Sequence, residues 1–198
     1  MRKSSLKVLF MVLIKLYTRR ENLETLKVVS IDGTLLPSYR FQDTTGYSGK
    51  HRLRGVKLSS VVDAKGVPIA FVFDTGNIHD ITLAFDTIDE LPMEIHLLSA
   101  KALVADMGYD SFLFRLYLKD LGIAPNIKKR PKTHIKQFFN DHFPSDPLIA
   151  KKRFVVERFH AWMKSNRRLR IRYDYTLLSF KAFVYLSAIV LCVRQIIA

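Results

Sequence analysis

Three acidic residues of this chain have the type and the surroundings needed for metal-dependent phosphodiester chemistry. Asp32 and Asp106 each end a short apolar run, and Glu157 is the one acid within a strongly basic stretch. Three carboxylates, with no cysteine pair and no closely spaced histidine pair, favour oxygen-loving ions such as Mg²⁺ or Mn²⁺. Two such ions about 3.5–4 Å apart activate a water or a 3′-hydroxyl and stabilise the leaving oxygen. If the three acids meet, they form a candidate catalytic site for two metal ions.

Each acid also has a structural explanation that the residues alone leave open. Glu157 could serve only as an ion-pair partner for Arg153 and Lys164, because charged helix faces are common. Asp32 before Gly33 is also typical of a residue that starts a turn. Burying an unpaired carboxylate is costly, however, so an acid at the end of a buried strand is unusual for packing alone.

Two short apolar segments would position the aspartates. Leu26–Asp32 and Ala102–Asp106 both predict buried strands that end on an acid. Sites in sheets of this kind form at the carboxyl ends of strands. If the two strands are neighbours, their carboxylates lie close together, and they repel each other unless a cation neutralises them.

Within the stretch from Arg153 to Arg172, the residues around Glu157 predict a helix, and a basic turn follows it. At about 100° per residue, four polar residues share one side of this helix, and three apolar residues lie roughly opposite. The polar side comprises Arg153, Glu157, His160 and Lys164. The apolar side, which we expect to be buried, comprises Val155, Phe159 and Trp162.

The rest of the chain predicts an α/β fold, with a mixed sheet flanked by helices. Val56–Val62 and Val67–Phe73 are β-branched runs joined by a short turn, which is typical of a hairpin. Further helices are expected at Ser4–Arg19, Ile81–Leu91, Ser111–Asp120 and Thr176–Ala198, and a further strand at Ile123–Ile127. We expect Asp80 to cap the helix that follows it. The alternative for this segment is that His79 binds a metal ion or contacts DNA.

The chain is strongly basic. It has 32 Lys and Arg against 18 Asp and Glu, a formal charge of +14. Such a field attracts polyanions, and nucleic acid is the first candidate; an anionic membrane or a ribosomal partner would also suit it. The segment Phe41–Arg54 predicts a flexible basic loop that either contacts phosphates or is simply solvated. The residues we expect to contact DNA are Lys50, Arg52, Arg54, Arg153, Lys164, Arg167 and Arg168.

Three features indicate a cytoplasmic, nucleoid-associated protein that does not enter a membrane. The single Cys192 lies in an apolar run, which fits a reducing compartment. Met1–Tyr17 begins like a signal peptide, but Lys15 interrupts its apolar run and no cleavage site follows. Thr176–Ala198 is apolar, but its charged residues leave too short a span for a bilayer. We interpret it as a helix packed on the core.

Five motifs occur in an order that resembles one family. Arg153, Glu157 and Lys164 have the spacing of a Tyr-x2-Arg-x3-Glu-x6-Lys signature, with Ala150 in place of the tyrosine. The other matching pieces are Ser30-Ile31-Asp32-Gly33, Asn77-x-His79-Asp80, Ala105-Asp106-Met107-Gly108-Tyr109 and Arg172-Tyr173-Asp174. From about Val28 onwards, the chain resembles the DDE transposases of bacterial insertion sequences, in the superfamily of insertion sequences four and five.

This resemblance implies an RNase H-like fold in which Asp32, Asp106 and Glu157 hold two Mg²⁺ or Mn²⁺ ions. The implied reaction is cleavage of a DNA strand by water, followed by attack of the freed 3′-hydroxyl on target DNA. Arg153 and Lys164 would hold phosphates near the cut. The implied partners are the ends of the insertion sequence, the target DNA and a second copy of the chain in a dimer on DNA.

The resemblance also suggests a division of the chain, with residues 1–25 as a helical remnant and 26–198 as the catalytic domain. Relatives have a longer region before the first aspartate, so we expect sequence-specific end recognition to come from an upstream segment. By itself the chain would then bind DNA without strong sequence preference. The short stretch of chain between Asp106 and Glu157 leaves undecided whether the reaction passes through a DNA hairpin intermediate.

Two other functions fit the same residues. One is an RNase H-like nuclease that uses the same three acids but only hydrolyses DNA. The other is a truncated or domesticated copy that binds DNA without catalysis. The presence of all three acids argues against decay of the site.

Overall fold

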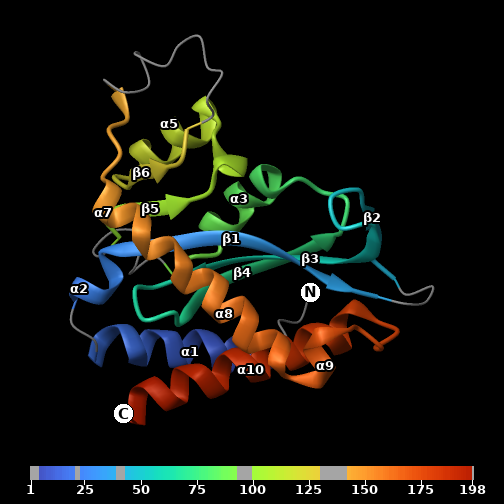
Figure 1. Cartoon of the computed structure of the whole chain (residues 1–198). Helices are drawn as coiled ribbons and strands as arrows, with labels where there is room; N and C mark the ends of the chain where they lie inside the picture. Colours follow the sequence, from blue (N-terminus) through green and yellow to red (C-terminus); the bar gives the residue numbers. More distant parts are fainter. Residues whose placement is uncertain (1–4, 21–22, 39–42, 93–99, 130–141, 198) are drawn as a thin grey trace.

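A six-stranded mixed sheet forms the centre of the protein (Figure 1). The computed structural model describes residues 5–20, 23–38, 43–92, 100–129 and 142–197. Five strands follow the order β2-β3-β1-β5-β6, and β4 also pairs with β3. The strands are β1 (Val28–Pro37), β2 (Gly46–Ser48), β3 (Leu53–Val62), β4 (Pro68–Thr75), β5 (Ala102–Ala105) and β6 (Ala124–Ile127). The predicted α/β fold with a mixed sheet is therefore confirmed.

The central strand β1 is longer than the sequence suggested. On one side it pairs antiparallel with β3, from Ser30 opposite Val62 to Pro37 opposite Gly55. On the other side its parallel pairing with β5 ends at Ser30. The prediction of a strand that ends on Asp32 is wrong, because the β3 pairing carries the strand past it. Asp32 instead lies just beyond the point where β1 loses its parallel neighbour.

Helices cover both faces of the sheet (Figure 1). They are α1 (Ser5–Arg20), α2 (Leu23–Leu26), α3 (Asp80–Asp89), α5 (Phe112–Asp120), α7 (Pro147–Ala150), α8 (Phe154–Ser165), α9 (Arg167–Arg170) and α10 (Leu177–Ile197). Helices α3 and α5 lie on one side, and α1 and α10 lie together on the other. Helix α8 packs against β1 and β3. Two short 3₁₀ helices, η1 (Met107–Tyr109) and η2 (Lys151–Arg153), precede α5 and α8.

The predicted hairpin is confirmed, and the basic loop before it proves to be partly ordered. Strands β3 and β4 pair antiparallel with a register shift at Val61 and Val62. Within the described part of the loop, β2 pairs with the start of β3, so Lys50 and Arg52 lie on the tight turn between two strands. The prediction of a flexible loop through Arg54 is wrong for residues 43–54; residues 41 and 42 lie outside the described residues.

The N-terminal helix α1 joins the main core. Phe10, Ile14 and Tyr17 are buried in the same apolar cluster as the sheet and α10. The Tyr17 hydroxyl also donates to Asp63 Oδ2 at 2.5 Å. The proposed division between residues 25 and 26 stays a prediction, although α1 packs on the same core as the rest of the chain.

Among the described helices, α10 is the one that is long and apolar enough to cross a membrane. In this structure α10 packs against α1, and its residues Phe180, Val184 and Cys192 are buried in the main apolar core. The expectation of an apolar helix packed on the core is confirmed.

Candidate active site

The register of the sheet brings the two predicted catalytic aspartates together. The parallel pairing of β1 with β5 matches Val28 to Ala102 and Ser30 to Val104. The same offset, continued for two residues, places Asp106 opposite Asp32. Asp106 directly follows β5 and caps η1, where its carboxylate accepts a hydrogen bond from Met107 N at 2.7 Å. The two strands that carry these acids are therefore neighbours, as expected, whereas the meeting of the two carboxylates stays a prediction.

Helix α8 adds the third acid through a shared arginine. Arg153 Nη2 lies 2.6 Å from Glu157 Oε1, and Arg153 Nη1 lies 4.0 Å from Asp32 Oδ2. The Glu157 side chain is 52% exposed and that of Asp32 is 22% exposed, so both open to solvent at the same edge. The ion pair considered for Glu157 therefore exists, with Arg153 as its partner. The same arginine also contacts Asp32.

Asp32 is a largely buried carboxylate whose pKa is raised mainly by burial. Burial raises its pKa to about 6, and the nearby carboxylates of Asp80 and Glu157 also raise it. The hydrogen bond from Gly33 N and the charge of Arg153 lower the pKa but do not restore its ordinary value. A divalent cation would favour the ionised form far more strongly than one guanidinium at 4.0 Å.

The three acids are suited to a hard metal ion by their chemistry. All supply oxygen, the donor that Mg²⁺ and Mn²⁺ prefer. Among the described residues, however, no three Asp, Glu, His or Cys side chains already converge at metal-binding distance. The Arg153 guanidinium lies between Asp32 and Glu157, so these two carboxylates approach a common ion only when it moves aside.

A fourth acid, Asp80, lies beside Asp32 and was missed by the sequence reasoning. Asp80 Oδ1 lies 2.9 Å from Lys57 Nζ on β3. A Cβ at Gly33 would come within 2.2 Å of the same oxygen, so glycine is the residue that lets Asp80 approach the backbone after Asp32. The prediction that Asp80 caps α3 is wrong. His79 holds that position without a side-chain cap, and Asp80 pairs across to the sheet instead.

The buried Tyr109 closes the site from the side of η1. Burial raises its pKa well above the ordinary value, and the charges of Asp32, Asp80 and Asp106 raise it further. Its hydroxyl lies 3.6 Å from the Cβ position of Gly33. The motif pieces around Gly33, Asp80 and Tyr109 therefore pack on one another, a relation that their separate places in the sequence did not reveal.

Lys164 extends the site along β1. Its Nζ donates to Thr34 Oγ1 at 2.6 Å, and Thr34 lies on the same face of the strand as Asp32. Burial lowers the pKa of Lys164, and the charge of Asp32 acts in the opposite direction. The arginine, the glutamate and the lysine of the α8 motif thus all face the segment of β1 that begins at Asp32.

Comparison with known proteins identifies the family. Residues 24–193 match the family described as "Transposase DDE domain". The chain belongs to this family. It is 36% identical over 154 residues to a putative transposase for insertion sequence element IS402 of Burkholderia cepacia, covering 75% of this chain and 68% of the relative. It is 28% identical over 138 residues to a putative transposase for IS6501 of Brucella ovis, covering 70% of this chain and 98% of the relative.

Solved structures of DDE enzymes are more distant. The catalytic domain of Mos1 mariner transposase is 10% identical over 88% of this chain and 98% of its own length, with a TM-score of 0.39. A chain of the simian T-cell lymphotropic virus intasome is 14% identical, with a TM-score of 0.45; the match spans 87% of this chain and about half, 49%, of that one. The expected fold class, an RNase H-like mixed sheet flanked by helices, agrees with the family and with the strand order observed here.

His160 of this DDE domain has a different place from the one predicted. It is buried, and its Nε2 lies 2.7 Å from Ser60 Oγ on β3, the residue paired with Asp32 across the sheet. Burial lowers the pKa of His160 to about 3, and the charge of Lys164 lowers it further. The polar side of α8 therefore faces the sheet at this point. Val155 and Phe159 are buried as expected, whereas Trp162 is only partly buried.

The other residues predicted to contact DNA lie in two places, on the β2–β3 hairpin and on α9. Lys50, His51 and Lys57 line a cavity of about 150 Å³ that also contacts Gly33 and Asp80, next to the acids. Burial lowers the pKa of His51, and the charges of the neighbouring Lys50, Lys164 and Lys57 lower it further. Arg52 and Arg54 are exposed on the same hairpin. Arg167 and Arg168 form the second group, on α9, and line a separate hollow.

Proposed function

We propose that this chain is the catalytic domain of an insertion-sequence transposase. It cleaves a DNA strand by hydrolysis and then joins the freed 3′ end to target DNA by transesterification. The observation that supports the proposal is the arrangement of the three acids: Asp32 and Asp106 each lie two residues beyond the paired segments of the neighbouring strands β1 and β5, and Arg153 contacts both Asp32 and Glu157. These acids come from separate parts of a chain that belongs to the DDE family.

Asp32, Asp106 and Glu157 are proposed as ligands for two divalent ions, Mg²⁺ or Mn²⁺. When bound, such ions supply an activated water or 3′-hydroxyl and stabilise the leaving oxygen. The raised pKa of Asp32 supports this role, because a buried acid close to other acids is stabilised by a cation. Asp80 and Lys57 hold the segment after Asp32 in place through their contact at 2.9 Å.

The basic residues around the acids are proposed to hold the DNA backbone. Arg153, at the N-cap of α8, and Lys164, near the end of α8, lie close to Asp32, and there they would bind phosphates next to the cut. Lys50, Arg52 and Arg54 on the β2–β3 hairpin would bind the strand on the other side of Gly33. The formal charge of +14 favours DNA as the partner, and such contacts position a duplex without reading its sequence. A dimer on DNA and action at the cytoplasmic nucleoid complete the proposal.

The test is a cleavage and strand-transfer assay with DNA that carries the ends of the insertion sequence. We expect Mg²⁺-dependent nicks and joined products from the purified chain, and no products in excess chelator. Asp32→Asn, Asp106→Asn and Glu157→Gln should each abolish both products while DNA binding remains nearly intact. Asp120→Asn is the matched control, because Asp120 is an exposed acid at the end of α5.

Three outcomes would overturn parts of the proposal. Near-normal cleavage by any one of the three acid variants would remove that residue from the triad. Cleavage that persists in chelator would exclude the metal mechanism. Nicks without joined products would assign the chain to hydrolysis alone.

A further inference from the structure

The segment after α8 presents two kinds of side chain in alternation. Leu169, Arg172 and Asp174 point inward and are buried. Residues before, between and after them are exposed, namely Arg167, Arg168, Arg170, Tyr173 and Tyr175. Tyr173 is 71% exposed although both of its neighbours are buried. An exposed aromatic ring on a tightly held backbone is the arrangement expected of a contact residue rather than of a core residue.

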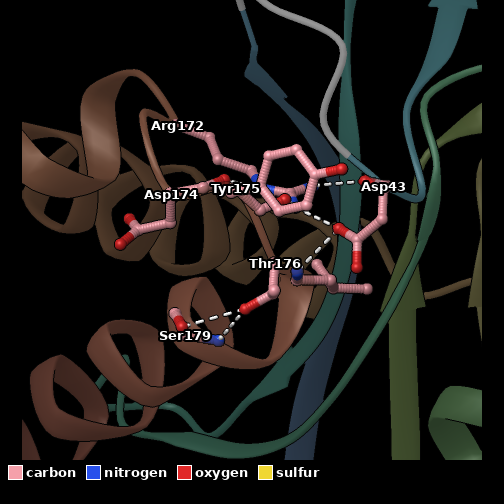
Figure 2. Close-up of polar contacts among 7 residues, drawn as sticks. Asp43, Arg172, Asp174, Tyr175, Thr176 and Ser179 are labelled. Atoms are coloured by element: carbon pink, nitrogen blue, oxygen red, sulfur yellow. Dashed lines mark hydrogen bonds and ion pairs between the residues drawn. The ribbon is translucent and has the colours of Figure 1, made fainter.

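Arg172 holds this segment rigidly (Figure 2). Its guanidinium donates to the carbonyl oxygens of Asp43 at 2.8 Å, Tyr175 at 2.8 Å and Asp174 at 3.0 Å. It also contacts the Asp43 carboxylate, which in turn accepts from Leu177 N at 2.7 Å at the start of α10. The Arg172 backbone N donates to Pro37 O at 2.7 Å, which ties the segment to the end of β1. Tyr173 is therefore pre-organised.

A hollow beside the Tyr173 ring is lined by several arginines. Arg167, Arg168, Arg170, Ile171 and Tyr173 line a hollow of about 560 Å³. Arg168 has an internal role, since it pairs with Asp174 at 2.6 Å and lies 4.1 Å from the centre of the Phe183 ring. Within the described part of the chain, Arg167 and Arg170 make no ion pair, so both guanidinium groups remain available for an anionic ligand.

The hollow lies at a fixed distance from the candidate active site along β1. The Arg172 backbone is bonded to Pro37, five residues beyond Asp32 on the same strand. At about 3.3 Å per residue this separation is about 17 Å. Successive nucleotides of a stacked strand in duplex DNA are about 3.4 Å apart along the helix axis. If the strand keeps this spacing up to the hollow, the hollow lies about five nucleotides from a phosphate at the acids. Lys164, bonded to Thr34, lies between the two places.

We infer that this hollow binds an unpaired stretch of the DNA strand about five nucleotides from the cut, with Tyr173 stacked on a base and Arg167 and Arg170 on phosphates. The inference rests on the proposed function and specifies which form of DNA the domain holds. Arginines alone would suit duplex phosphates equally well. The exposed ring decides the form, because a base presents its face to an aromatic side chain only when it is unpaired or unstacked. The strand is therefore open at this distance from the reacting phosphate.

The test uses 2-aminopurine, a base analogue whose fluorescence is quenched when it stacks. Oligonucleotides with one analogue at each of positions one to nine from the cleavage site, in a single-stranded arm, are titrated with the full chain in chelator. We expect quenching centred about four to six nucleotides from the cut. Tyr173→Ala should abolish it and weaken binding of the single-stranded arm by about tenfold or more. Binding of a fully paired duplex should change little.

Two variants keep the test specific. Tyr173→Phe retains the ring and should behave as the wild type. Tyr175→Ala removes an equally exposed ring that does not line the hollow, and should also leave the quenching in place. Because the binding assay contains chelator, its result does not depend on cleavage. If the chain cleaves DNA but Tyr173→Ala retains both quenching and affinity, the proposed function stands and this inference is overturned. Loss of the quenching in Tyr175→Ala instead of Tyr173→Ala would overturn the inference as well.

Discussion

Acidification should loosen the helix that carries Glu157, because His160 is buried in its neutral form. His160 Nε2 lies 2.7 Å from Ser60 Oγ. Burial lowers the pKa of His160 from the ordinary 6.5 to about 3, and the nearby charge of Lys164 contributes to this lowering. A histidine whose pKa is lower in the folded state does not change the free energy of unfolding well above pH 6.5, where neither state is protonated, and lowers it increasingly as the pH falls from 6.5 toward 3.

The size of the effect follows from these two values. At pH 8 neither state binds a proton at His160, so the residue has no effect on the free energy of unfolding. At pH 5 the unfolded chain is almost fully protonated there while the folded chain is not, which lowers the free energy of unfolding by about 2 kcal/mol. For a domain with ordinary stability of about 5–15 kcal/mol, this is a large fraction.

The measurement is urea unfolding of the wild type and of His160→Gln at pH 8 and pH 5. Glutamine cannot titrate, and its amide can still donate to Ser60. The comparison is necessary because other groups titrate in the same range; the raised pKa of Asp63, for example, acts in the opposite direction. We expect the wild type to lose about 2 kcal/mol more than the variant between the two pH values.

Equal losses in both proteins would refute the reasoning. Such a result would mean that His160 is solvated or protonated in the folded state, and that α8 is not fixed to β3 by the contact described. An NMR titration of the histidine rings provides an independent check: His160 should show no shift change between pH 8 and pH 5.

Three other perturbations test separate parts of the structure. Lys164→Ala should reduce the slope of log K against log salt on duplex DNA by about 0.9, the value for one phosphate contact; an unchanged slope would limit Lys164 to its bond with Thr34. Gly33→Ala should displace Asp80, lower the free energy of unfolding by about 1–3 kcal/mol and reduce cleavage. Its control is Gly108→Ala, where an added Cβ meets no atom within 4 Å and thermal unfolding should change little. Arg172→Met should cost about 3 kcal/mol or more in urea unfolding because it leaves buried carbonyls unpaired; a smaller loss would show that the segment is held by other contacts.

The sequence predicted Asp106 and the α8 motif well because both depend on local pattern. An apolar run that ends on an acid is a short-range signal, and β5 does end directly before Asp106. The spacing of Arg153, Glu157 and Lys164 depends on the helical period alone, and α8 is helical over Glu157 and Lys164, with Arg153 at its N-cap. The roles of these residues in catalysis stay predictions.

Features that depend on a partner strand were not predictable in this way. The length of β1 is set by its pairing with β3, which the residues after Asp32 do not reveal. His160 lies at the centre of a polar helix side, yet it is buried because Ser60 lies beneath it. Asp80 had a satisfactory local role as a cap, and only the position of Lys57 on another strand shows that it serves elsewhere.

The pairing of α1 with α10 has a consequence for synthesis of the protein. The two helices are the first and the last that the structure describes, and each covers apolar residues of the other. At about 5–20 residues per second, a ribosome needs about 8–30 s to extend the chain from Arg20 to Leu177. During that interval α1 lacks the cover of α10, including the contact of Phe10 with Tyr185. A chain whose translation stops before α10 would contain all three acids but no closed core, and is expected to aggregate or be degraded rather than to cut DNA.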